Sequence, residues 1–569
     1  MTGPYSGGSG ASPGAPPVPP AGPVAPGTPS AAVQQPLLSE HPPPSLKRDA
    51  ALSGKARRKA AKQTARRERE EKRAELAAKR QENRAGGRRP GPRGFTGKGG
   101  GRVSYVEAPP EWRGTTVQVC GLWPFGAGSG TPMIGVPVGR ELGSGAALCC
   151  DPISWFQRAG LIHNPSCLVL GKPGLGKSSL IRRMVLGLTG VGVFPMVLGD
   201  LKPDYTDLIT ALGGQVIKLG RGLGSLNVLD PGESGGAVAK LTGRARQKLA
   251  ADAHGRRLNM VSALMTVLRG APIPDTERTI LNAALRVLDD RHHGVPILPD
   301  LIRCIDEGPD AVRAVTLARG SEDRYRAAVD PLHASLLGLL DGPMGETFAA
   351  HTTTPIQLDA PGGVCIDISG IDDADAELQA AVLLACWSDG FGAVEAAHAL
   401  ADEGLGPQRH FFVVLDELWR VLRAGRGLVD RVDALTRLNR QYGLGQAMIT
   451  HTMADLLALP DEADRMKAKG FAERAGMVIC GGLPMAEMPA LTEVVRMSSA
   501  ERDMIVDWSS PPSWDPSLNK DGDPPGRGKF LVKVGGRPGI PFHVDFTPAE
   551  REVNDTNKRW MHSTTRVNR

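Results

Sequence analysis

The stretch CLVLGKPGLGKSSLIRRMVLGL, residues 167–188, joins an apolar run to a glycine-rich turn and then to a helical pattern. Residues 171–178 match G-x-x-x-x-G-K-S, in the strand-to-helix setting that the chemistry of this motif requires. The glycines let successive backbone N–H groups point at phosphate oxygens, with the positive N-terminus of the next helix behind them. The stretch therefore predicts a phosphate-binding P-loop. A glycine-rich turn that contains Lys-Ser by chance is the weaker alternative.

This loop predicts ATP and Mg²⁺ as ligands. Lys177 is expected to reach the β- and γ-phosphates and to serve catalysis, and Ser178 is expected to bind the magnesium ion. The expected nucleotide contacts are Gly171, Lys172, Pro173, Gly174, Leu175, Gly176, Lys177, Ser178 and Ser179.

A second motif, HFFVVLDELW at residues 410–419, is an apolar run that ends in two carboxylates. We expect Asp416 to lie in the magnesium shell and Glu417 to be the general base, because a carboxylate beside the metal can accept a proton from the attacking water. Any buried strand can end in acidic residues, so this motif alone is a weak signal. Its pairing with a P-loop strengthens it and predicts an ATPase.

Short apolar runs alternate with helical segments downstream of Asp151, which indicates an α/β fold with a parallel sheet. Most of the runs are continuous, as expected for strands buried on both faces. The expected strands are residues 167–170, 194–200, 215–219, 362–369, 410–417, 446–451 and 476–481.

Two other regions carry a pattern of their own. Residues 235–340 have helical periodicity without a comparable strand, and predict an inserted helical subdomain. Residues 529–546 predict a hairpin, followed by a helix in which Thr547 is the N-cap and Glu550 lies three residues on.

The N-terminal part differs in composition from the rest of the chain. Residues 1–46 contain 13 prolines among small residues and predict a disordered tail. Residues 47–102 contain 20 Lys and Arg against 6 Asp and Glu, a local charge of +14, so the remainder of this +7 chain carries 7 − 14 = −7. Within this segment, residues 55–84 predict a solvated helix. The segment is either a polyanion contact or a solubility tail.

We therefore expect four regions: the tail, the basic segment, a short leading region at 103–150, and an ATPase domain at 151–569 that contains the helical insertion. The eight cysteines lack zinc-ligand spacing and indicate buried thiols; a redox role for the adjacent Cys149 and Cys150 is the weaker alternative. No run approaches about 18 apolar residues, so no transmembrane span is expected.

Two further strand ends lie at the edge of the sheet where ligands bind in open α/β folds. Asp200 is followed by Lys202 and Asp204, and Thr450 is followed by His451. For His451, a sensor of the γ-phosphate and an ordinary polar strand end are comparable interpretations. Arg437 and Arg440 are candidates for a phosphate-neutralising arginine, and a solvated helix face explains them about equally well.

Taken together, these segments resemble the conjugation-type ATPases that energise type IV secretion channels, within the wider superfamily of RecA-like, ring-forming DNA translocases and pumps. The resemblance covers most of residues 130–550. Besides the two nucleotide motifs it rests on DLKPDYTDLITALGGQVIKLGRGLGSLNVLDP (200–231), on the helical insertion, and on GGVCIDISGIDDADAELQAAVLL (362–384). This chain departs from the family at His451, where Gln is common, and at Gln441, where Lys is frequent.

The resemblance implies an ATP-hydrolysing motor that forms a ring, with six subunits expected and Arg440 completing a neighbour's site. It implies membrane-embedded secretion or conjugation channel proteins as partners, and a location in the cytoplasm or at the inner face of the cell membrane. A pump that grips nucleic acid directly through residues 47–102 is the first alternative, and a nucleotide-gated scaffold without turnover is the second. The candidate general base Glu417 argues against the scaffold, because a chain without turnover would not need one.

Overall fold

The protein is described from a computed structural model, which covers residues 70–75, 131–424, 428–436, 443–515 and 520–553. Residues 70–75 belong to the basic segment and are helical and exposed. The predicted tail at 1–46, the rest of 47–102 and the candidates Arg437 and Arg440 lie outside the described residues.

The core is one mixed sheet of eleven strands, in the order β2-β1-β13-β12-β9-β3-β8-β7-β4-β6-β5. The segment from β9 to β5 is parallel throughout, and the strands from β2 to β12 join it antiparallel. The parallel strands are β3 (Ser166–Leu170), β4 (Phe194–Asp200), β5 (Gln215–Lys218), β6 (Val364–Asp367), β7 (Phe411–Leu415), β8 (Leu444–Ile449) and β9 (Met477–Cys480). All seven apolar runs predicted as strands are confirmed.

Both faces of this sheet are covered, which explains why the runs are continuous rather than alternating. In β3, Leu168 and Leu170 belong to one apolar core, whereas Cys167 and Val169 belong to the core on the opposite face. The second core contains residues of α3 (Pro152–Gln157), α4 (Lys177–Gly190) and α5 (Thr206–Ala211). The first contains residues of α13 (Ala376–Asp402), α14 (Leu418–Arg423), α15 (Leu428–Thr436), α16 (Met453–Leu457), α17 (Glu462–Arg474), α18 (Met488–Val494, preceded by the 3-10 turn Met485–Glu487) and α19 (Ser499–Asp507).

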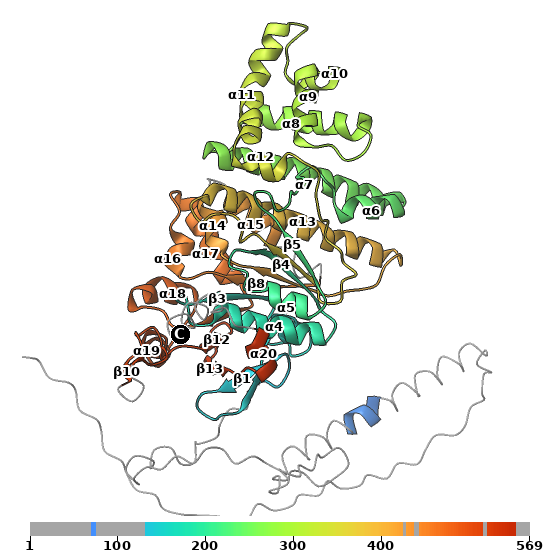
Figure 1. Cartoon of the computed structure of the whole chain (residues 1–569). Helices are drawn as coiled ribbons and strands as arrows, with labels where there is room; N and C mark the ends of the chain where they lie inside the picture. The colour runs from blue at the N-terminus through green and yellow to red at the C-terminus, as the bar shows by residue number, and fades with distance from the viewer. Residues whose placement is uncertain (1–69, 76–130, 425–427, 437–442, 516–519, 554–569) are drawn as a thin grey trace, which may run out of the picture. The chain divides into compact units, whose positions relative to one another are not determined.

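The chain between β5 and β6 is helical, which confirms the predicted insertion into the sheet. Figure 1 shows these helices above α13, on the side away from the terminal strands. They are α6 (Glu233–Lys240), α7 (Gly243–Arg269), α8 (Asp275–Arg291), α9 (Leu298–Glu307), α10 (Asp310–Val315), α11 (Glu322–Asp341) and α12 (Pro343–Phe348). Helices α6 and α7 pack on α13. Helix α13 is long and apolar enough to cross a membrane by length and composition, but 78% of its apolar window is buried inside the protein.

The sheet begins earlier than the boundary expected at Asp151. Strands β1 (Pro137–Glu141) and β2 (Ala147–Cys149) precede it, and β1 pairs with the C-terminal strand β13 (Ile540–Val544). Asp151 itself joins the two parts, because its carboxylate accepts hydrogen bonds from the backbone N–H of Ser154 (2.6 Å) and Val136 (2.9 Å). These strands are short. β1 pairs with a strand from the far end of the chain, with Gly139 opposite Val544, and β2 pairs with β1, so no local pattern marks them.

The predicted hairpin and helix cap at the C-terminus are confirmed. Strand β12 (Lys529–Lys533) pairs antiparallel with β13, and helix α20 (Pro548–Val553) follows. Thr547 Oγ1 accepts the Glu550 N–H (3.3 Å), and the Glu550 carboxylate accepts the Thr547 N–H (2.8 Å), which is a reciprocal capping box.

The cysteines are packing residues as expected. The seven cysteines in the described residues are free and buried, and Cys120 lies outside them. Burial raises the pKa of Cys150 well above its usual value, with the charge of Asp151 adding to the effect. A thiol that is hard to deprotonate is a poor nucleophile, which argues against a redox role for this pair.

Candidate functional site

The P-loop connects the end of β3 to the start of α4. Gly174 and Gly176 have φ of 79° and 98°, in the left-handed region that favours glycine. A Cβ at Gly174 would meet no atom within 4 Å, so the backbone conformation rather than crowding requires glycine there. The neighbouring strands hold the loop: the Gly171 N–H donates to the carbonyl of His451, and the Lys172 N–H donates to the carbonyl of Gly482, both at 3.0 Å.

Lys177 is the first residue of α4, and its side chain is buried beneath the loop. Its ammonium donates to the carbonyl oxygens of Gly171 (2.6 Å) and Lys172 (3.3 Å) and lies 3.0 Å from His451 Nδ1. Burial lowers the pKa of Lys177 to about 8, although the charges of Asp416 and Glu417 oppose the shift. Lys177 is therefore cationic at neutral pH, and a phosphate could replace these carbonyl partners.

Asp416 and Glu417 follow β7 and face the P-loop across the same edge of the sheet. Glu417 has φ of 51°, a strained value for a residue with a side chain, and it is the N-cap position of α14. Burial, together with the adjacent charge of Glu417, raises the pKa of Asp416 to about 7. Tyr205 donates a hydrogen bond from its hydroxyl to Asp416 (3.4 Å).

The Glu417 carboxylate contacts three side chains. Trp419 Nε1 donates to Oε2 at 2.6 Å, while His451 Nε2 and Lys202 Nζ lie 3.3 Å and 3.5 Å from Oε1. Burial alone would raise the pKa of this group, but the hydrogen bonds of His451 and Trp419, the positive charge of Lys202 and that of His451 when its ring is protonated outweigh burial and hold the pKa at about 2. Glu417 is therefore fully ionised in this arrangement.

His451 bridges the two motifs. The Lys177 ammonium has no lone pair, so we assign His451 Nδ1 as the acceptor of the 3.0 Å contact. Nε2 then carries the ring proton and donates it to Glu417 (3.3 Å). An amide side chain could also donate at one atom and accept at another in this position.

Asp200 has a structural task at this edge. Its carboxylate accepts the backbone N–H groups of Lys202 (3.3 Å), Asp204 (3.0 Å) and Tyr205 (2.7 Å), and burial raises its pKa to about 6. Asp200 thereby fixes the loop that carries Lys202 towards Glu417 and Tyr205 towards Asp416.

One cavity brings most of the sequence-predicted residues together. From the candidate set it is lined by Pro173, Gly174, Gly176, Lys177, Ser178, Ser179, Asp200, Lys202, Asp204, Asp416, Glu417 and His451. Three residues in or beside this cavity were not predicted from the sequence. Arg182 lies one helical turn after Ser178, a spacing that could have flagged it, and Trp419 lies two residues after Glu417. Arg527 has no local signal.

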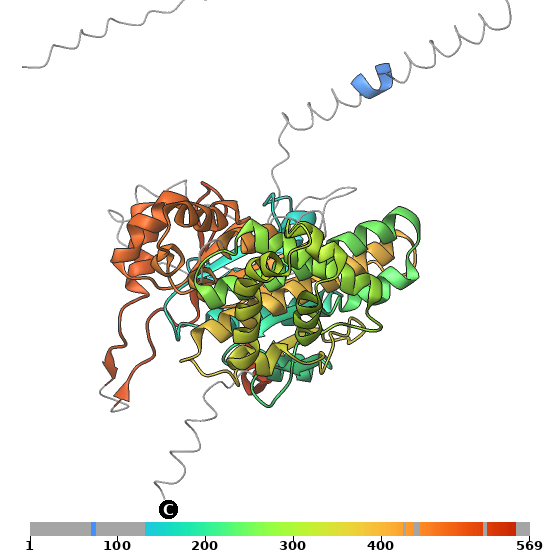
Figure 2. The same ribbon diagram turned by 90° about the horizontal axis from the view of Figure 1, so that it is seen from above.

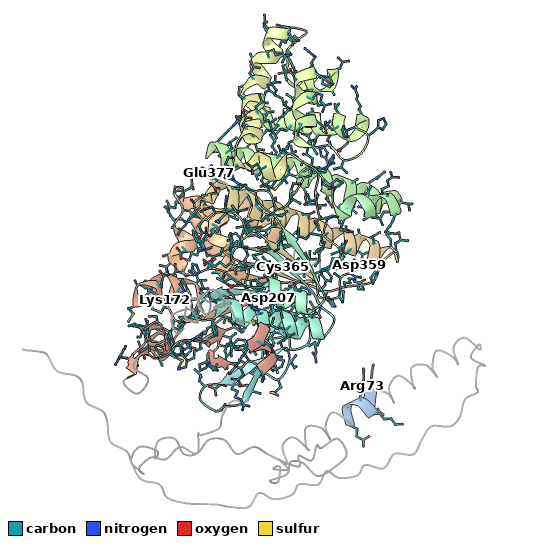
Figure 3. The ribbon with its side chains drawn as sticks, viewed as in Figure 1. Arg73, Lys172, Asp207, Asp359, Cys365 and Glu377 are labelled. Atoms are coloured by element: carbon teal, nitrogen blue, oxygen red, sulfur yellow. The ribbon has the colours of Figure 1, made fainter. Side chains whose placement is uncertain are left out.

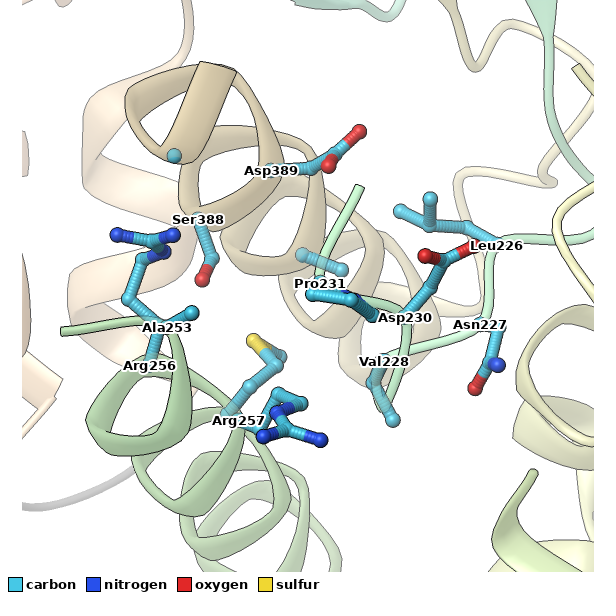
Figure 4. A pocket seen from close by; sticks show the side chains of 13 residues that line it. Leu226, Asn227, Val228, Asp230, Pro231, Ala253, Arg256, Arg257, Ser388 and Asp389 are labelled. Atoms are coloured by element: carbon cyan, nitrogen blue, oxygen red, sulfur yellow. The ribbon is translucent and has the colours of Figure 1, made fainter. Parts of the chain in front are cut away.

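A second pocket lies where α7 meets α13 (Figure 4). Its charged side chains make contacts at the junction between the helical insertion and the rest of the domain. Arg256 contacts Glu395 and donates to Ser234 Oγ (2.6 Å), and Arg257 pairs with Asp289 (2.6 Å). Burial, with the charge of Asp230 adding to it, raises the pKa of Asp389 to about 7.

The residues of the first cavity fit a magnesium-bound nucleoside triphosphate. The loop offers backbone donors in a glycine-dependent conformation, a buried ammonium, and a half-buried carboxylate at Asp416 for the metal shell. Among the described residues, no cluster of three or more His, Cys, Asp or Glu side chains could hold a metal ion on its own. Magnesium bound through one carboxylate, a hydroxyl and substrate phosphates needs no such cluster.

Comparison with known proteins bears on the fold. No family model matches the chain, and no curated protein matches it. The solved structure of VirB4 of Thermoanaerobacter pseudethanolicus is 18% identical, covers 75% of this chain and 100% of that one, and gives a TM-score of 0.54. At this identity the likeness concerns the fold, and it confirms the α/β architecture that the resemblance to type IV secretion ATPases implied.

The plasmid coupling protein TrwB is a more distant match. Its complex with ADP and Mg²⁺ is 13% identical over 67% of this chain and 86% of that one, with a TM-score of 0.42. Its complex with the ATP analogue ADPNP is 12% identical over 72% and 89%, with a TM-score of 0.42.

Proposed function

We propose that this chain binds ATP with Mg²⁺ in the cavity between the P-loop and β7, and hydrolyses it. The observation that carries the proposal is the connection from Lys177 through His451 to Glu417, at contacts of 3.0 and 3.3 Å. This connection joins the phosphate-binding cation to the candidate base. A glycine-rich turn with only a structural role would not require such a connection.

In the proposed site the loop residues 171–179 surround the phosphates, and the backbone N–H donors are those of residues 174–179. Pro173 has no N–H, and the N–H groups of Gly171 and Lys172 already donate to neighbouring carbonyls. Lys177 turns from the Gly171 carbonyl to the β- and γ-phosphates. Ser178 and Asp416 would hold the magnesium ion. The ion, when bound, neutralises negative charge that develops on the phosphates. Asp416 must be ionised for this task, and its raised pKa of about 7 makes metal loading favour pH values above neutrality.

Glu417 orients the attacking water and accepts its proton in this proposal. A carboxylate whose pKa is about 2 is a weak base, because an efficient base has a pKa closer to the working pH. When Lys177 leaves His451 for phosphate, Nδ1 of His451 loses its donor, and the ring is free to turn from Glu417. The loss of that contact raises the basicity of Glu417 when a nucleotide is in place.

The test is phosphate release from MgATP by the wild-type chain and by Lys177→Ala and Glu417→Gln variants. ATP turnover by the wild type, with nucleotide binding lost in the first variant and turnover alone lost in the second, supports the assignment. A wild-type chain that binds ATP without turnover would favour the nucleotide-gated scaffold.

We further propose that hydrolysis drives assembly of, or transport through, a conjugative or type IV secretion apparatus. The resemblance of residues 200–231 and 362–384 supports this, together with a fold like that of VirB4. The proposed motor is a ring of six subunits, in which Arg440 of one subunit completes the site of the next. Its proposed partners are channel proteins at the inner face of the membrane.

A DNA pump that grips nucleic acid directly is the second candidate, and the local +14 of residues 47–102 favours it. The two functions are separated by ATP turnover measured with double-stranded DNA, single-stranded DNA and neither. DNA-stimulated turnover that is lost when residues 1–102 are deleted would support the pump. ATP turnover that is the same with and without DNA would support the secretion motor.

A further inference from the structure

Arg527 reaches the nucleotide cavity from the C-terminal part of the chain. It comes two residues before β12, and β12 runs antiparallel to β9, with Leu531 opposite Cys480. The antiparallel direction brings the start of β12 to the edge where the parallel strands end. Arg527 accordingly lines the same cavity as the P-loop.

Its side of the cavity is opposite that of Glu417. In the sheet, β12 lies two strands from the P-loop strand β3 in one direction, and β7 lies two strands away in the other. Asp416 and Glu417 follow β7 and define the γ-phosphate end of the proposed site. A nucleotide laid along the P-loop with that polarity has its other end, the α-phosphate and nucleoside, on the side of Arg527.

The backbone around Arg527 is fixed to the P-loop. A Cβ at Gly526 would lie 2.2 Å from the carbonyl oxygen of the buried Trp508, so only glycine allows this approach. Gly528 has φ of 72°, and its N–H donates to the carbonyl of Leu175 in the P-loop (3.0 Å). The Arg527 Cα is therefore held in place from both sides.

A second contact ties the same segment to the loop. Lys172, labelled in Figure 3, donates from Nζ to the carbonyl of Ser509 at 3.0 Å. Between Ser509 and Arg527 the chain carries the ribbon of β10 (Trp514–Asp515) and β11 (Lys520–Asp521), which projects from the body in Figure 2. Both ends of this segment thus meet the P-loop.

The Arg527 side chain is available for a ligand. It is 55% exposed, and it pairs with Asp523 at 2.8 Å, whose own side chain is 81% exposed. Exposed pairs four residues apart contribute little to stability, so this one competes weakly with a phosphate. A guanidinium is always charged and binds phosphate oxygens with two parallel N–H donors.

We propose that Arg527 is a nucleotide-binding residue that contacts the α-phosphate end, the part that ADP and ATP share. The inference rests on the proposed function, because it needs a nucleotide in this cavity. It adds to Lys177, Arg182 and Lys202, which line the same cavity, a cation that comes from the C-terminal part of the chain and lies opposite Glu417.

The experiment is calorimetric titration of the full chain with ADP and with the non-hydrolysable analogue ADPNP, each with Mg²⁺. The variants are Arg527→Ala, Arg527→Lys and Asp523→Asn. The matched control is Arg537→Ala, an exposed arginine at the far end of β12. Because a hydrogen-bonded charge pair with phosphate is among the stronger polar contacts, Arg527→Ala should weaken both ligands by about tenfold or more. Arg527→Lys should restore part of the affinity, and the other two variants should bind as tightly as the wild type.

Three results overturn the inference. Arg527→Ala binding both ligands like the wild type would remove Arg527 from the site. Loss of affinity for ADPNP alone would place Arg527 at the γ-phosphate. An equal loss in Asp523→Asn would make the pair a structural feature of the loop. A wild-type chain that binds neither ligand would instead overturn the proposed function, and the inference with it. Unfolding temperatures measured beside the titrations show that each variant is folded.

Discussion

Glu417→Gln tests the proposed mechanism most directly, because it changes one charge and almost no volume. Glutamine keeps an oxygen that can accept the Trp419 N–H, now 2.6 Å from the carboxylate. Its amide group cannot act as a general base. The P-loop, Lys177 and Asp416 are left intact. We therefore expect normal binding of ADPNP and a fall in ATP turnover on the order of a hundredfold or more.

The same substitution should also lower stability, and the structure gives its size. The contacts around Glu417 hold its pKa at about 2, against an ordinary value of 4.5. A difference of this size corresponds to about 3 kcal/mol. A lowered pKa means that this stabilisation is present above pH 4.5 and is lost as the pH falls through 2. The neutral glutamine variant lacks it at pH 7, so its unfolding temperature without nucleotide should fall.

The assays are phosphate release, calorimetric binding of ADPNP, and thermal unfolding with and without nucleotide. Glu346→Gln, an exposed glutamate on α12, is the matched control and should change none of them. Turnover at the wild-type rate in Glu417→Gln would refute the assignment of the base. Unchanged stability at pH 7 would refute the inferred strength of its contacts.

Four further predictions follow from the sequence and the structure. Lys177→Ala should abolish nucleotide binding by calorimetry, because it removes the buried cation under the loop; unchanged binding would contradict the P-loop assignment. Deletion of residues 1–102 should leave ATP turnover nearly unchanged and weaken DNA or anionic-membrane binding with a steep salt dependence, whereas equal DNA binding by both chains at low and moderate salt would exclude this segment as the contact. Mixing Arg440→Ala with Glu417→Gln subunits should partly restore turnover if an arginine acts across the subunit boundary; activity absent at every ratio, with rings shown to form, would argue against a shared site. The unfolding temperature of the Asp389→Asn variant should increase relative to that of the wild type as the pH rises from 5 to 8. The pKa of the Asp389 carboxyl is near 3.8 in the unfolded chain but about 7 in the folded protein, so the wild type loses stability as the pH rises from about 4 to about 7, where only the unfolded state ionises. The part of this loss between pH 5 and 7 is about 3 kcal/mol, and asparagine avoids it; a pH-independent difference would contradict the shift.

The strands and the two nucleotide motifs could be predicted because their signals are local. A strand buried on both faces needs a continuous apolar run, and all seven such runs are parallel strands of the sheet. The P-loop conformation needs glycine where φ is positive, and this requirement is written in Gly174 and Gly176. The cap formed by Thr547 and Glu550 has a fixed spacing of three residues.

The rest depended on contacts between distant parts of the chain. Strands β1 and β2 are short; β1 pairs with the distant β13 and β2 pairs with β1, so no periodicity marks them. The sequence placed Asp200 and His451 at one sheet edge, but it could not assign their tasks. Asp200 binds the backbone of its own loop, whereas His451 joins Lys177 to Glu417.

The sequence by itself determined which residues can bind phosphate, hold a metal ion and accept a proton, because those abilities belong to side-chain chemistry and to the backbone freedom of glycine. Only the tertiary structure decided how these residues are charged and which others join them. The pKa of Glu417 depends on Trp419, His451 and Lys202, which meet there because three strand ends converge. Arg527 reaches the cavity because β12 runs antiparallel to β9, a direction that is set by sheet pairing and not by any residue nearby.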